Sequence, residues 1–263
     1  MNKKDQINKI KNQFKEYFSL SQKALVKGNS LLSIIEKTIN NYPKGAKKLC
    51  SALYTQTIRL LRGIIILCRS GLDEEAFILM RSLLENVSYL LFIAEEDHEN
   101  RAELYQHSRA LSRVQEIKQF MTMRPKGGKI LDDTHYKKME REALKYFRKK
   151  HGANKTEKEI RSKYTLRPQN AAEQLKSFDV KEFLKTNYGI FYRPASSVTH
   201  GEAPLRFVQN KDNSIHLKKI SSGKLTKICL QTSTICVLCA IEYLVKFLNV
   251  NKKFDTNSIL NQI

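Results

Sequence analysis

The spacing of the apolar residues constrains this chain more than any other feature. Between residues 73 and 94 they recur at steps of three and four, which places them on one face of an α-helix. This face holds Phe77, Met80, Leu84, Val87, Leu91 and Ala94, and it is widened by Leu79, Leu83 and Leu90. Only a narrow polar stripe remains, formed by Arg81, Glu85 and Ser88. The pattern predicts a central helix that is surrounded by others.

The same period recurs along most of the chain and predicts an all-α fold, a multi-helix bundle. Further helices are expected over residues 4–26, 31–39, 46–69, 99–123, 133–150, 156–164, 170–176, 180–186 and 224–248. One small β-hairpin is expected near residues 205–220, where apolar runs flank the polar turn 210–213. Only 10 Gly and 5 Pro occur and no linker divides the chain, so residues 1–263 are predicted to form a single helical domain.

The chain is strongly basic, with 47 Lys and Arg against 26 Asp and Glu and a net charge of +21. This excess favours a polyanionic partner, although frequent use of lysine without a specific partner is the alternative. The charge is unevenly spread. Residues 71–103 hold nine acidic and two basic residues, whereas residues 113–167 hold 17 basic and seven acidic ones. We interpret the section from 113 to 167 as a basic helical insertion that faces a phosphate backbone.

The cysteines and the apolar segments indicate the cellular compartment in which the protein is located. The five cysteines are odd in number and lie in apolar helical sequence, so reduced thiols and a cytoplasmic location are expected. Cys236 and Cys239 have C-x-x-C spacing without a second ligand pair, so neither a metal nor a cofactor is expected. The most apolar segment, residues 228–248, contains Glu242 and Lys246, which predicts a buried helix and no stable membrane insertion. A peripheral membrane role of the lysine-rich N-terminal helix stays open.

Two motifs could hold phosphate or a polar site. The loop Lys126-Gly127-Gly128-Lys129 offers backbone N–H groups and two ammonium groups, so Lys126 and Lys129 are candidate substrate ligands. It lacks the residue order of a P-loop, and a plain interhelical loop is the alternative. Arg81 and Glu85, four residues apart on a mostly apolar helix, predict a semi-buried ion pair. This pair is either a structural clasp or half of a polar site.

Arg193 and His200, with six residues between them, are the candidate catalytic pair. RNA cleavage by its own 2′-hydroxyl needs a proton acceptor or donor near neutral pH and a cation against the charge on the phosphate. His and Arg supply both without a metal. Tyr192, Ser196 and Ser197 lie in the same polar segment and are candidate substrate contacts.

Three observations weigh against this pair. Pro194 disfavours helical geometry at Arg193, which would then lie just outside the start of a helix. His200, directly before Gly201, is also suited to the C-terminal end of a helix. Arg101 and His107 give a second match with similar spacing in an ordinary charged helix, so spacing alone decides nothing.

Short motifs in two parts of the chain carry a family resemblance. They are Gly71-Leu72-Asp73-Glu74-Glu75-Ala76 with Arg81-Ser82-Leu83-Leu84-Glu85, and Ser196-Ser197-Val198-Thr199-His200-Gly201. Over residues 53–248 the chain resembles a bacterial and archaeal family catalogued as domain of unknown function 5677. Thr199 stands where that family has an aliphatic residue, and the basic middle section carries no match.

That family is itself similar to the higher eukaryote and prokaryote nucleotide-binding (HEPN) helical domains. Many of those are ribonuclease toxins or antiphage effectors that act as dimers, with Arg and His in a cleft between protomers. The resemblance implies that Arg193 and His200 are the motif pair and that Arg81 and Glu85 are its polar support. It also implies a homodimer.

The expected function is therefore a metal-independent endoribonuclease of a toxin or antiphage-defence type that acts on RNA rather than DNA. The alternative is a non-catalytic helical module that binds nucleic acid or a protein, in which Arg81, Glu85 and His200 form a structural polar network.

Overall fold

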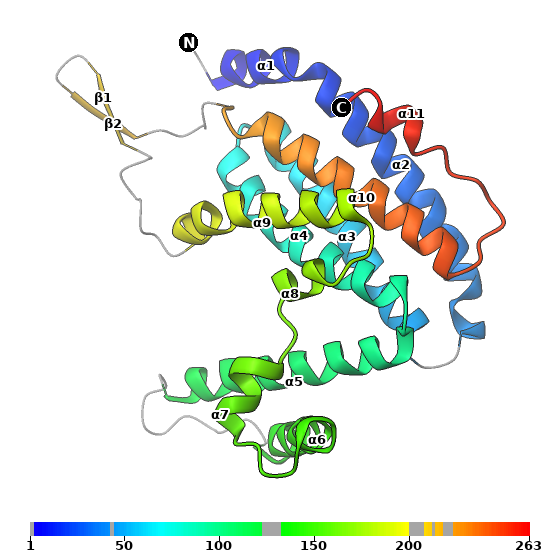
Figure 1. Cartoon of the computed structure of the whole chain (residues 1–263). Helices are drawn as coiled ribbons and strands as arrows, with labels where there is room; N and C mark the ends of the chain where they lie inside the picture. Colours follow the sequence, from blue (N-terminus) through cyan, green and yellow to red (C-terminus); the bar gives the residue numbers. More distant parts are fainter. Residues whose placement is uncertain (1–2, 43–44, 123–132, 200–207, 212–213, 218–222) are drawn as a thin grey trace.

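The computed structural model describes the backbone of residues 3–42, 45–122, 133–199, 208–211, 214–217 and 223–263. Side chains are described for residues 4–42, 45–119, 134–191 and 223–263. The fold is all-α, a multi-helix bundle, as the apolar period predicted (Figure 1). The N-terminal helices are α1 (Lys3–Gln13), α2 (Lys15–Thr38), η1 (Ile39–Asn41), α3 (Ala46–Arg69) and α4 (Asp73–Glu95). They are followed by α5 (His98–Thr122), α6 (Asp133–His151), α7 (Glu157–Glu159), the π-helix η2 (Ile160–Tyr164), α8 (Pro168–Glu173), α9 (Phe178–Thr199), α10 (Thr226–Phe247) and α11 (Asn257–Leu260).

Helix α4 lies at the centre of the bundle, where it packs against α3, α8, α9 and α10. Its apolar face is buried, and Met80, Leu83 and Leu90 are completely enclosed. The prediction of a central helix is confirmed. Burial of this face contributes to the stability of the fold, because the free energy gained scales with the apolar area removed from water.

The predicted break between residues 26 and 31 is wrong, because α2 continues through Gly28. The missing side chain at Gly28 lets α3 approach closely, and a Cβ at this position would overlap the side chain of Ile58. The Tyr54 hydroxyl donates a hydrogen bond to the Gly28 carbonyl oxygen at 3.1 Å. Tertiary packing therefore overrides the low helix propensity of glycine.

A second, smaller core lies away from the bundle, between α5, α6 and η2 (Figure 1). It buries Leu111, Ala143, Leu144, Phe147 and Ile160. We call the part of the molecule formed by α5, α6, α7 and η2 the arm. Figure 1 shows α6 and α7 beside α5 and apart from α10 and α2.

Arg161 of η2 holds the arm together. Its guanidinium donates to the Leu111 carbonyl oxygen at 2.7 Å, to Glu140 at 2.6 Å and to Glu157 at 2.7 Å. Glu140 also accepts from Lys118 of α5 at 2.8 Å. These contacts join α5, α6, α7 and η2, so α6 has a defined position against α5.

Helix α9 differs from its prediction. The helical piece expected over residues 180–186 instead extends from Phe178 to Thr199 without interruption. The expectation that Arg193 lies outside the start of a helix at Pro194 is therefore wrong. Proline lacks an N–H group and destabilises a helix interior, so other contacts must hold this stretch helical.

The described residues between α9 and α10 form two short strands, β1 (Val208–Lys211) and β2 (Ser214–Leu217). They pair antiparallel, with Val208 opposite Leu217 and Lys211 opposite Ser214. They lie next to each other in Figure 1, at the side of the molecule near the start of α10.

Two helices, α4 and α10, are long and apolar enough to cross a membrane by length and composition alone. Core helices meet the same criterion, so the finding is weak support for a membrane location. In this bundle 72% of the apolar window of α4 and 61% of that of α10 are buried against other helices.

Candidate functional site

Arg81 and Glu85 form an ion pair on the face of α4. The Arg81 Nε atom donates to Glu85 Oε1 at 3.1 Å, and the two side chains are 22% and 30% exposed. The pair is thus half-buried rather than free in solvent. Glu85 fixes the direction of the Arg81 guanidinium, which suits either a structural clasp or the support of a nearby anion.

Helix α9 packs against α4 and α8 and forms a hydrogen bond with α10. The Phe191 ring packs edge-on against Phe77 of α4, with 5.7 Å between the ring centroids. On the other side, Thr232 of α10 donates to the Asn187 side-chain oxygen at 3.3 Å. These two contacts lie within the two turns before Pro194 and fix the position of α9 up to that residue.

The two helices run in opposite directions. Glu95 at the end of α4 binds the backbone of Lys176 just before α9, whereas Phe77 near the start of α4 meets Phe191. The last turns of α9 therefore continue past the first turn of α4. Arg81 lies one turn beyond Phe77 in α4, and Arg193 lies two residues beyond Phe191 in α9.

The remaining predicted site residues are placed only in part. The backbone of Tyr192, Arg193, Ser196 and Ser197 belongs to the last two turns of α9, and their side chains are outside the described set. His200, Lys126 and Lys129 lie outside the described residues altogether.

A pocket of about 530 Å³, which the sequence did not predict, lies on the arm. Its walls include Tyr105, Gln106, Arg109 and Arg113 from α5 and Met139 from α6. The three- and four-residue steps between the α5 members place them on one helix face. That spacing was visible in the sequence, but the predicted basic section began only at Arg113.

The arm also holds two stacked His–Tyr pairs. His107 lies parallel to Tyr146 with 4.2 Å between ring centroids, and His151 lies parallel to Tyr164 at 4.1 Å. Burial lowers the pKa of His107, against an opposing effect of Glu103 and Glu142. The pKa of His151 is also lowered, by burial and by Lys150 and Lys155. Both imidazoles are therefore held in their neutral form more readily than a free histidine.

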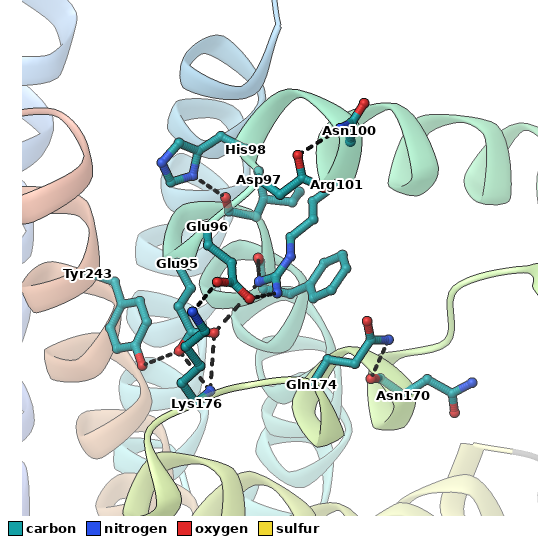
Figure 2. A network of polar contacts seen from close by, with 12 residues as sticks. Glu95, Glu96, Asp97, His98, Asn100, Arg101, Asn170, Gln174, Lys176 and Tyr243 are labelled. Atoms are coloured by element: carbon teal, nitrogen blue, oxygen red, sulfur yellow. Dashed lines mark hydrogen bonds and ion pairs between the residues drawn. The ribbon is translucent and has the colours of Figure 1, made fainter. Parts of the chain in front are cut away.

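Arg101, which the sequence placed in an ordinary charged helix, belongs to a network at the end of α4 (Figure 2). It donates to the Phe92 carbonyl oxygen at 2.6 Å and to Glu96 at 2.7 Å, and it lies 3.6 Å from Glu95. Figure 2 shows Tyr243 and Lys176 reaching Glu95 from other elements. We call this network the α4–α5 clasp. Arg101 and His107 have separate partners, which favours structural roles for both.

The C-x-x-C pair lies in α10 and is part of the core. Cys236 is completely buried, and Cys239 packs against the same cluster. Burial, followed by the charge of Glu242, raises the pKa of Cys239 to about 12. Since the thiolate is the reactive form, this environment does not suit a redox or metal-binding thiol.

Comparisons with known proteins add one finding. No curated protein and no solved structure matches the chain. The sequence model of one family, described as a family of unknown function (DUF5677), matches residues 47–215, from the first turn of α3 into β2. This range covers more than half of the chain and includes both motif segments. The chain belongs to this family of unknown function, DUF5677.

Proposed function

We propose that this protein is a metal-independent endoribonuclease of a toxin or antiphage-defence type, in which Arg193 and His200 act on RNA. The continuity of α9 through Pro194 to Thr199 carries the proposal, because it removes the main objection to Arg193. Seven residues span nearly two helical turns. Helical geometry continued to residue 200 would place Arg193 and His200 on one face.

The chemistry follows from the two groups. The neutral imidazole of His200 accepts the proton of the ribose 2′-hydroxyl, whose oxygen attacks the adjacent phosphorus. The bond from phosphorus to the 5′-oxygen breaks, and this oxygen takes up a proton. The products are a 2′,3′-cyclic phosphate and a 5′-hydroxyl end. The Arg193 guanidinium stabilises the charge on the phosphate oxygens in the transition state.

A homodimer completes this scheme. One imidazole cannot be both the acceptor of the first proton and the donor of the second in the same instant, and a second copy supplies another histidine. The distant similarity to HEPN domains is part of the proposal, as is a cytoplasmic location. The excess of 21 positive charges supports an RNA substrate, because it raises the local concentration of polyanions.

The experiment compares RNA cleavage, in the presence of a chelator, by the unaltered protein and by His200→Ala and Arg193→Ala. Both variants are expected to lose at least about a hundredfold in rate, the size of a general acid–base contribution. Exposed residues provide matched controls, His135→Ala on α6 and Arg59→Ala on α3, and these keep full activity. A folded His200→Ala protein with undiminished cleavage would remove the proposal.

The second candidate is a nucleic-acid- or protein-binding module without cleavage. The Arg81–Glu85 ion pair favours it, because Arg81 already has a carboxylate partner and fits a structural role. In that case His200→Ala lowers the melting temperature, and RNA is bound in a salt-sensitive manner without being cut.

A further inference from the structure

The pocket on the arm has the size and the composition of a nucleotide site. Its volume of about 530 Å³ lies within the range of small-molecule and cofactor sites, roughly 300–1,000 Å³. It opens on the face of α5 that carries Arg109 and Arg113, and α6 closes one side of it through Met139. The pocket therefore brings basic side chains of α5 and an apolar side chain of α6 together at one hollow of the surface.

Arg109 and Arg113 differ from the arginines that stabilise the fold. Arg81, Arg101 and Arg161 are each held by a glutamate at 2.6–3.1 Å. By contrast, the described side chains include no carboxylate within ion-pair distance of Arg109 or Arg113, and both arginines are exposed. Four residues apart, they lie one turn from each other on the helix, so their guanidinium groups can bind one phosphate together.

The rest of the pocket suits the nucleoside part. Ala110 and Met139 provide an apolar wall, and Tyr105 is half-buried with its ring edge-on to Tyr89 at 4.9 Å. The Gln106 amide has both donors and an acceptor. Glu116, at the same pocket, can accept a hydrogen bond from the amino group of a base.

The pocket also stands on a fixed frame. Met139 precedes Glu140, which Arg161 and Lys118 bind from η2 and α5. On the other wall, Leu111 follows Ala110 and is buried in the core of the arm. Both walls are thus held by contacts that lie outside the pocket, which limits the ordering that a ligand must bring about.

We infer that this pocket binds one nucleotide unit, with the phosphate held by Arg109 and Arg113 and the base placed against the apolar wall of Ala110 and Met139. The inference rests on the proposed function only for the source of the nucleotide. In a ribonuclease the nucleotide is part of a single-stranded RNA; without that activity the ligand is a free nucleotide. It assigns the arm a role in holding the substrate, away from the reacting groups of α9.

The test measures binding by fluorescence anisotropy with a labelled, 2′-O-methylated RNA oligonucleotide. This probe lacks the 2′-hydroxyl, so binding is separated from cleavage. The variant is Arg109→Gln with Arg113→Gln. Its matched control is Arg59→Gln with Arg62→Gln, which removes two exposed arginines and the same charge from α3. AMP and adenosine serve as competitors in a parallel series.

The pocket variant is expected to bind at least about tenfold more weakly, as for the loss of charged hydrogen bonds. For this variant, the slope of the logarithm of the association constant against the logarithm of the salt concentration becomes less steep by about 1. The control changes affinity by less than about twofold and keeps the slope. AMP competes and adenosine does not, because adenosine lacks the phosphate. If the two substitutions weaken the binding of AMP but not that of the oligonucleotide, the site is confirmed and its ligand is a free nucleotide.

Equal losses in the pocket variant and in the control would show that net charge alone governs binding and would overturn the site. Absence of saturable binding of either probe to the unaltered protein would do the same. These outcomes are independent of the ribonuclease proposal, which fails only when unmodified RNA is not cut through His200.

Discussion

Phe191 of α9 packs edge-on against Phe77 of α4, with the ring planes at 83°. This contact fixes the last described side chain of α9 before the turns that contain Arg193. Because Phe77 is buried and α4 is the centre of the bundle, the geometry at the end of α9 depends on the main core.

The contact predicts an energetic coupling between the two rings. In a double-mutant cycle of Phe77→Ala and Phe191→Ala, the interaction free energy is expected to be about 1 kcal/mol, the value for an edge-to-face aromatic pair. Urea unfolding of the four proteins measures it. Additive effects of the two substitutions would show that the rings do not interact.

The continuity of α9 predicts that Pro194→Ala stabilises the protein. Alanine restores an N–H donor to the helix interior and removes the ring that crowds the preceding turn, a gain of about 1–3 kcal/mol. Pro168→Ala is the control, because Pro168 lies in the first turn of α8, where proline is tolerated and no gain is expected. Thermal melting compares them, and an unchanged Pro194→Ala protein would place a helix boundary at this residue.

The α4–α5 clasp predicts a large cost for the loss of Arg101. Its side chain is 11% exposed, so Arg101→Met leaves the Glu95 carboxylate enclosed without its cation. Removal of one partner of a buried pair destabilises by about 3 kcal/mol, measured as the free energy of unfolding in urea. The exposed Arg59→Met stays within about 0.5 kcal/mol of the unaltered protein. Equal stability of the two variants would contradict a structural role of the clasp.

The stacked histidines predict a dependence of the arm on pH. The folded state lowers the pKa of His107 and His151 below the usual value, so the unfolded chain binds protons more readily. The stabilising effect of the neutral rings is complete above about pH 6.5 and is lost as the pH falls through the lowered values. The protection factors of the α6 amides, which compare the observed exchange rate with the intrinsic rate at the same pH, should therefore fall below about pH 6.5.

The control for this dependence is a His107→Gln and His151→Gln protein, in which the fall in protection factors is smaller because Gln does not titrate. If both proteins show the same change with pH, the carboxylates of the arm, and not the imidazoles, govern its stability.

Local patterns made the main part of the fold predictable. The apolar face of α4 was read directly from its spacing, because that spacing reports a single helix and needs no partner. The breaks expected between residues 26 and 31 and at Pro194 were wrong. At Gly28 the close packing of Ile58 and Tyr54 of α3 is a long-range contact that the local pattern does not report, and at Pro194 the prediction rested on a local backbone preference that α9 does not follow.

The candidate site was predictable only within single helices. The spacing of Arg81 and Glu85 predicted their ion pair, which the structure contains. The pocket on the arm was not predicted, because Met139 meets Arg109 and Arg113 only when Arg161 and Glu140 dock α6 onto α5. Such long-range contacts leave no periodic signal in the sequence.

The most direct test of the proposed function uses a DNA oligonucleotide with a single ribose, incubated with the protein and a chelator. Attack by a 2′-hydroxyl can occur only at that ribose, so the expected result is one cut on its 3′ side. Mass spectrometry should find a 2′,3′-cyclic phosphate on the product, and His200→Ala should yield none. An uncut oligonucleotide, cuts at deoxyribose linkages, or the same product from His200→Ala would contradict the account.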